Sequence, residues 1–218
     1  MEEIIREILD LEWNMMGQME DAENDEAERP VFEAMRRAQF DAWSEAPAAS
    51  YLQDLRSAQA DGRNLQTEKF TRMLRNIAPE EYAKRTAEFE AVSEEKAALI
   101  AEIWEKMKKL NQEFAERYPV LGMSGRPLLA EQEADIPSVE TYQCSELETY
   151  SMQTLQLFRD FLLADIEAGN NLVEQIQKNT VASMGYKSLG DAERELALAA
   201  LAQMGGTECS SCGMVPAF

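Results

Sequence analysis

Apolar residues recur along most of the chain at intervals of three or four, and this spacing predicts helices. The stripes cover residues 4–19, 30–43, 51–58, 64–74, 93–118, 155–166, 171–176 and 188–204. Gly62, Gly169 and Gly185 stand where helices should end, and Pro30 and Pro79 stand where they should begin. No segment alternates apolar and polar residues convincingly. We therefore expect an all-α protein, a bundle of about eight or nine helices.

Polar residues at the starts of the stripes support these boundaries. Asn64, Ser93 and Asn171 can each accept a free backbone N–H of the first helical turn. Two of them share a local pattern, Gly-x-Asn-Leu, which starts at Gly62 and at Gly169, 107 residues apart. The ordinary residue preferences at helix ends explain this recurrence, because glycine commonly ends helices and asparagine commonly begins them. The alternative is an internal repeat of two helical corners.

The longest stretch without helical spacing covers residues 118–137 and holds two glycines and three prolines. A connection of this length is uncommon in a compact domain and is often functional. We expect one helical domain over residues 1–204, which divides into halves 1–117 and 138–204 if the loop is a linker. Residues 205–218 follow a Gly-Gly break and are expected to form a flexible tail.

Composition adds several exclusions. The 218 residues include 21 Lys and Arg against 41 Asp and Glu, a net charge of −20, which disfavours nucleic acids and anionic membranes as partners. The chain has no histidine, so His-dependent nucleophiles and His-ligated metals or haem are excluded. No signal peptide or membrane-spanning run is recognisable, and three cysteines do not form a disulfide framework. We therefore expect a cytoplasmic protein.

Two groups of polar residues are candidates for a ligand site. Glu140, Cys144 and Glu148 share one face of a helix, and Tyr142, Glu146 and Tyr150 share the neighbouring face. Such carboxylates can bind a divalent cation or act as acid and base, although an abundant residue such as Glu also forms plain solvated faces. The second group lies after the first Gly-x-Asn-Leu corner and comprises Arg63, Asn64, Glu68, Lys69, Arg72 and Arg75. Its basic face can hold an anion or pair with the surplus of Glu.

The tail carries a third candidate, the pair Cys209 and Cys212. A Cys-x-x-Cys pair can ligate zinc or an iron–sulfur cluster, or cycle between dithiol and disulfide. One pair supplies two of the four ligands of a tetrahedral site, and no strand–helix context surrounds it. An inert tail is the alternative reading.

Several segments together resemble a known family. They are Arg37-Ala38-Gln39-Phe40 with Trp43, residues 62–74, 140–151 and 169–172, and Gly185-Tyr186-Lys187-Ser188-Leu189. The chain resembles, over about residues 13–192, an uncharacterised bacterial and archaeal family, domain of unknown function number four thousand one hundred and twenty-five. The resemblance implies a single soluble unit and carries no assigned reaction. Members have a Gly-Gly-Arg segment and a Cys-Gln pair after the first Trp-x-Met, and residues 19–25 here contain neither.

These observations leave the reaction and cofactor unknown and support two hypotheses. The leading one is a small-ligand or metal pocket between helices, in a binding protein or an enzyme, with a small anionic ligand as one candidate occupant. Its walls would be Arg63, Asn64, Glu68, Arg72, Glu140, Tyr142, Glu148 and Tyr150, with Cys209 and Cys212 as separate metal candidates. The alternative is a non-catalytic helical module that binds a protein partner, suggested by the net charge and by methionines on apolar faces.

Overall fold

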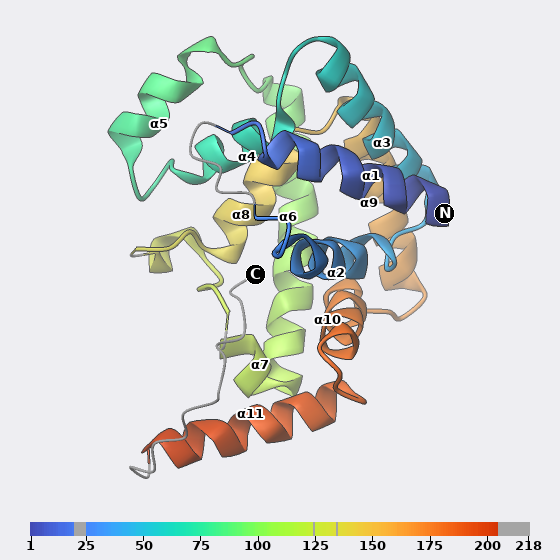
Figure 1. The fold of residues 1–218 in the computed structure, drawn as a ribbon, viewed down its shortest axis with the longest axis vertical. Helices are drawn as coiled ribbons and strands as arrows, with labels where there is room; N and C mark the ends of the chain where they lie inside the picture. The colour runs from blue at the N-terminus through green and yellow to red at the C-terminus, as the bar shows by residue number, and fades with distance from the viewer. Residues whose placement is uncertain (20–24, 124, 134, 205–218) are drawn as a thin grey trace.

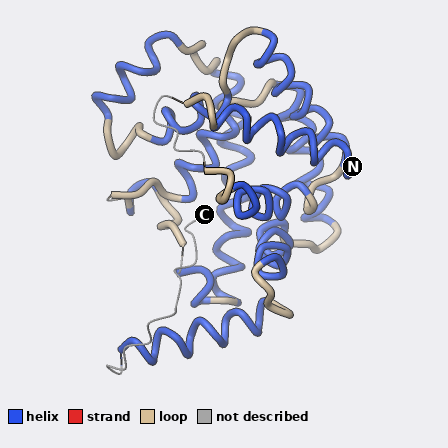
Figure 2. The backbone as a smooth tube through the Cα atoms, viewed as in Figure 1, coloured by secondary structure: helices blue, strands red, loops and turns tan. Residues whose placement is uncertain are grey.

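The structure, a computed structural model, describes residues 1–19, 25–123, 125–133 and 135–204. Within these ranges it is all-helical and contains no strand, as the sequence predicts (Figure 2). Its α-helices are α1 (Glu2–Met16), α2 (Arg29–Phe40), α3 (Glu45–Ala60), α4 (Leu65–Met73), α5 (Pro79–Arg85), α6 (Glu94–Arg117), α7 (Pro119–Met123), α8 (Val139–Leu147), α9 (Met152–Glu167), α10 (Leu172–Ser183) and α11 (Leu189–Met204). Two 3₁₀ helices, η1 (Thr86–Glu88) and η2 (Ala130–Gln132), complete the set.

The expected number of eight or nine helices is too low, since the described residues contain 11 α-helices. One unexpected helix is α7, which lies in the stretch 118–137 that was predicted as a loop. Pro119 opens it, because proline suits a first helical position where the N–H has no partner. The expected tail, residues 205–218, lies outside the described residues.

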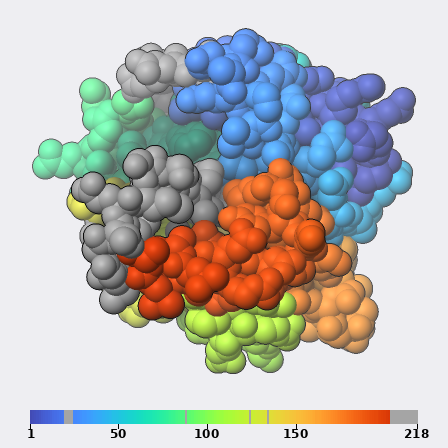
Figure 3. Space-filling model, turned by 60° about the horizontal axis from the view of Figure 1, so that its bottom comes forward, coloured from blue at the N-terminus to red at the C-terminus, as the bar shows by residue number. Residues whose placement is uncertain are grey.

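Helix α6 runs through the middle of the molecule and organises the packing (Figure 1). It packs against α8, α9 and α10, while α1 packs against α2, α3 and α4. The two groups are joined by three further pairs, α2 with α10, α4 with α8, and α3 with α9. The main apolar core lies between them and includes Ile8, Leu55, Ile103, Leu155 and Leu162, all fully buried. Helix α11 lies across one end, against α7 and α10 (Figure 3).

The two Gly-x-Asn-Leu corners have the same geometry. Gly62 and Gly169 have φ of 70° and 81°, in the left-handed region that ends a helix without steric cost only for glycine. The side-chain oxygens of Asn64 and Asn171 cap α4 and α10 by accepting the backbone N–H of Thr67 and of Glu174, which confirms both predicted caps. Each asparagine also donates from Nδ2 to a carbonyl of another helix, in α1 and in α6 respectively.

Candidate functional site

A carboxylate lies in the apolar stripe of α1. Glu12 follows Ile5 and Ile8 on the buried face of this helix and is fully buried. Arg36 of α2 meets it with two parallel hydrogen bonds, Nε to Oε2 at 2.7 Å and Nη2 to Oε1 at 2.6 Å. The hydroxyl of Tyr51 on α3 donates to the same carboxylate at 2.7 Å. A bidentate guanidinium and a hydroxyl therefore compensate the loss of water around this charge.

A second buried carboxylate, Glu146 of α8, shares Arg36. Arg36 Nη2 donates to its Oε1 at 3.0 Å, and Tyr150 donates to the same oxygen at 2.8 Å. Lys69 of α4 donates to Oε2 at 2.6 Å. Two carboxylates and two cations thus balance in the middle of the fold. Glu12, Arg36, Lys69 and Glu146 are referred to below as the ion cluster.

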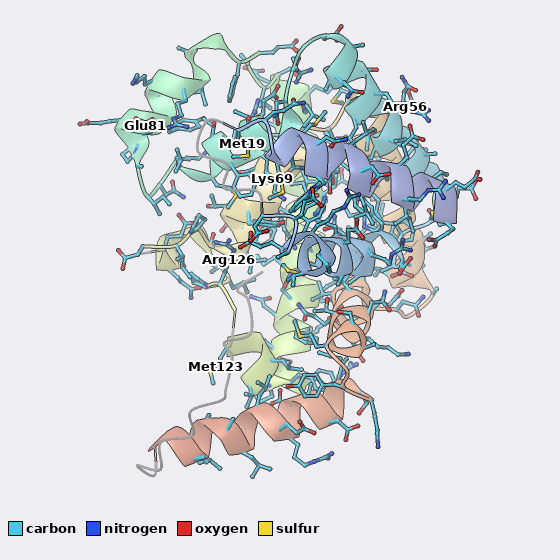
Figure 4. The ribbon with its side chains drawn as sticks, in the orientation of Figure 1. Met19, Arg56, Lys69, Glu81, Met123 and Arg126 are labelled. Carbon is cyan, nitrogen blue, oxygen red and sulfur yellow. The ribbon has the colours of Figure 1, made fainter. Side chains whose placement is uncertain are left out.

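Glu146 and Lys69 keep their charges despite their burial. Burial by itself would raise the pKa of Glu146, but Arg36 and Lys69 outweigh it and hold that pKa well below its usual range. Burial would lower the pKa of Lys69, yet the Glu146 carboxylate beside it raises that pKa overall. Lys69 also donates to the hydroxyl of Tyr142 at 2.7 Å and lies near the centre of the molecule (Figure 4).

A second group of ion pairs lies where α4 meets the C-terminal end of α8, with Glu68 and Arg72 buried and Arg63 and Arg75 more exposed. Arg72 contacts Glu148 at 3.1 Å and Glu68 at 3.3 Å, and Arg63 holds Glu68 with two bonds of 2.9 Å. Arg75 Nη2 donates to both oxygens of Glu148 at 2.7 and 2.8 Å. The basic residues in and after α4 therefore face the carboxylate at the end of α8. Arg72 and Arg75 form the ion pairs to Glu148 that connect the two segments.

A cavity of about 180 Å³ adjoins the ion cluster. It lies between α2, α6, α8 and α10, and its apolar walls include Met107, Phe158, Leu172, Val173 and Ile176. Its polar lining residues are Arg36, Gln39, Asn111, Tyr142, Gln143, Glu146, Tyr150, Gln177 and Thr180.

The charges among these lining residues are already paired. All five N–H groups of Arg36 donate to Glu12, Gln39 or Glu146. The buried Oε1 of Gln143, by contrast, accepts no hydrogen bond from the described residues. Gln143 is therefore one lining residue whose hydrogen-bonding capacity the described residues do not use fully.

The residues predicted from the sequence fall in different places. Tyr142 and Tyr150 line the cavity, whereas Asn64 caps α4 and Glu140 accepts a bond from the Ala130 N–H at 2.9 Å. Arg63, Glu68, Arg72 and Glu148 pair with one another where α4 meets the end of α8.

No metal site emerges from the described part of the chain, which contains no group of three or more Cys, Asp or Glu side chains placed to hold an ion. Cys209 and Cys212 lie outside the described residues. Cys144 is a free thiol, and burial together with Glu140 and Glu148 raises its pKa to about 12.

Sequence reasoning missed the residues at the centre of the site. Glu12, Arg36 and Tyr51 were not among the candidates, and Glu146 was noted only as part of a helix face. A signal for Glu12 was present, because it occupies a position of the α1 stripe where an apolar residue is expected. The partner Arg36 carries no such mark, since it lies 24 residues away on another helix.

None of the helices in the described ranges combines the length and the apolar character that crossing a membrane requires. Comparison with curated proteins and with solved structures yields no match. A family model described as "Protein of unknown function (DUF4125)" matches residues 2–194. That match covers nearly the whole helical fold and includes the ion cluster and the cavity, so the chain belongs to the DUF4125 family.

Proposed function

We propose that the protein binds a small uncharged organic molecule in the cavity between α2, α6, α8 and α10. The observation that carries this proposal is a space of about 180 Å³ beside a wall whose charges are paired and whose Gln143 amide oxygen is not. A dry protein cavity of about 150 Å³ accommodates benzene, so there is room here for a ring of that size.

The lining favours a neutral occupant over an ion. A bound anion would find Arg36 already occupied by two carboxylates and Gln39, and would lose its water without a free cation in return. A bound cation would meet carboxylates that Arg36 and Lys69 already neutralise. An apolar ring against Phe158 and Ile176, with one N–H or O–H toward Gln143, matches the walls better.

The proposed pocket differs from the one expected from the sequence in its lining residues and in the charge of its ligand. Tyr142 and Tyr150 stay in the proposed site. The pair Arg72–Glu148 is assigned to holding α4 against the end of α8, and the pairs of Glu68 with Arg63 and Arg72 to the start of α4. The small anionic ligand gives way to a neutral one. A metal or redox role for Cys209 and Cys212 and a protein partner stay predictions.

Binding can be followed through Trp43, which lines the cavity. We would titrate the protein with benzene, benzamide and benzoate and record tryptophan emission and the midpoint of thermal unfolding. Benzene and benzamide should change the emission and raise the midpoint, benzamide more strongly, and benzoate should do neither. Trp43→Phe should remove the emission change and keep the thermal shift.

Ile176→Trp should fill the cavity and abolish both effects, whereas Leu198→Trp on the exposed surface of α11 should leave them intact. The proposal fails if neither neutral probe shifts the unfolding midpoint of the wild-type protein. It also fails if the shifts persist in Ile176→Trp, because the probes would then bind elsewhere.

A further inference from the structure

Corresponding residues of two chain segments make the same backbone hydrogen bonds at a constant separation of 107 positions. The end of α2 has the bonds Asp41 N–H to Arg37, Ala42 to Gln39 and Trp43 to Phe40, at 2.8 to 3.1 Å. The end of α8 repeats them as Glu148 to Cys144, Thr149 to Glu146 and Tyr150 to Leu147, at 2.9 to 3.1 Å. Helices α3 and α9, both 16 residues long, follow in the same register, and so do the two Gly-x-Asn-Leu corners.

Equivalent residues of the two segments also touch each other. Gln39 Nε2 donates to Glu146 Oε1 at 3.2 Å, and these residues are 107 positions apart. The rings of Trp43 and Tyr150, separated by the same interval, are 6.3 Å apart. Self-contact of equivalent positions is the mark of an isologous, two-fold interface. The helix pairs agree, since exchanging α1 with α6, α2 with α8, α3 with α9 and α4 with α10 leaves the main packing pairs unchanged.

The corner asparagines fix the register of α1 against α6. Asn64 donates to the carbonyl of Met15, and Asn171 donates to that of Leu110, which sets a separation of 95 positions. At this separation the buried residues of the two helices coincide: Ile5, Ile8, Leu9 and Glu12 correspond to Ile100, Ile103, Trp104 and Met107. The place of Glu12 in the first group of helices is therefore taken by Met107 in the second.

The counterparts of the ion cluster line the cavity. Arg36, Tyr51 and Lys69 correspond at the 107-residue interval to Gln143, Phe158 and Ile176, and each of these faces the cavity together with Met107. A Glu-Arg-Tyr-Lys set in one group of helices is thus a Met-Gln-Phe-Ile set in the other. In the first set Arg36 and Tyr51 both donate to Glu12, and Lys69 pairs with Glu146. The second set has no charged side chain.

We propose that the chain is an internal duplication, with α1–α4 and α6, α8–α10 as two copies of one four-helix unit. The site formed by Glu12, Arg36, Tyr51 and Lys69 in the first unit is called the Glu12 niche, and the cavity is its counterpart in the second unit. The boundary between the units then falls before α6 and not in the stretch 118–137. The ligand part of this inference rests on the proposed function. It specifies the ligand as a neutral donor that bonds to Gln143, at the position where the first unit has the guanidinium of Arg36.

The equivalence can be tested by transferring the ion pair from one niche to the other. We would prepare Met107→Glu, Gln143→Arg and the double variant in the full chain, and measure urea unfolding in a buffer with trimethylamine N-oxide, which keeps weakened variants folded. Each single change buries an unpaired charge and should lower the folding equilibrium constant. The double variant should exceed the additive expectation by about tenfold or more, because contacting residues couple.

Gln177→Arg provides a matched control, since Gln177 lines the same cavity but corresponds to Phe70 and not to Arg36. Combined with Met107→Glu it should show additive losses. Additive losses in the Met107→Glu, Gln143→Arg pair, or equal coupling with Gln177→Arg, would overturn the equivalence of the two niches.

Benzamide titration of the double variant separates this inference from the proposed function. Coupling together with loss of benzamide binding supports both. Coupling in a protein whose wild type binds no neutral probe supports the duplication and refutes ligand binding. Benzamide binding without coupling supports the proposed function and refutes the equivalence of the niches.

Discussion

Replacing Arg36 by methionine tests how strongly the ion cluster contributes to stability. The change removes five donated hydrogen bonds and leaves Glu12 and Glu146 buried without their shared cation. Loss of one partner of a buried ion pair costs about 3–5 kcal/mol. For a protein of this size, that loss corresponds to a fall of roughly 6–20 °C in the unfolding midpoint.

The measurement is urea unfolding followed by circular dichroism, with calorimetry for the midpoint. Arg56→Met is the matched control, because Arg56 makes two 2.7 Å bonds to Glu7 but both side chains are nearly half exposed. An exposed pair contributes about 0–1 kcal/mol. If Arg36→Met and Arg56→Met lower the free energy of unfolding equally, burial does not set the value of these pairs and the reasoning is refuted.

Three further predictions follow from other contacts. The depressed pKa of Glu146 means that the unfolded chain binds a proton there first as pH falls. The contribution of Glu146 to stability should therefore be fully present at neutral pH and be lost below about pH 4.5, with a shallower decline in Glu146→Gln, as measured by urea unfolding from pH 7 downward. Cys144, whose pKa is raised to about 12, should react with iodoacetamide at pH 8 far more slowly than the free amino acid, as followed by peptide mass spectrometry; rapid labelling would contradict its burial. Gly62→Ala and Gly169→Ala should each cost about 1–2 kcal/mol in urea unfolding, because both glycines have positive φ; a cost at one corner alone would show that the corners differ.

The features that the sequence predicts correctly are local ones. Asn64 and Asn171 cap their helices through atoms three residues away, so a short stretch of chain contains all the information needed. The same holds for the left-handed glycines and for the Ser93 cap of α6. Helix α7 was not predicted because its five residues are too few to show a repeat of apolar positions.

The central site depends on contacts that no local pattern contains. Arg36 and Glu146 are 110 residues apart, and Lys69 and Glu146 are 77 apart. The sequence singles out polar residues on α4 and α8 as candidates. It does not indicate which of them face inward, because that depends on how α4 packs against α8. The cavity is harder still, since it arises from four helices whose apolar residues look like ordinary core positions.

The packing of helices from one group against helices of the other has a consequence for chain connectivity. Helix α2 packs against α10, and α4 packs against α8, so each of the two groups of helices covers apolar surface of the other. A cut in the segment between η1 and α6, which contains the exposed residue Glu90, would leave these contacts in place. The two resulting fragments should therefore stay associated after proteolysis and, when expressed separately, should fold only on mixing, as two chains of an obligate heterodimer do.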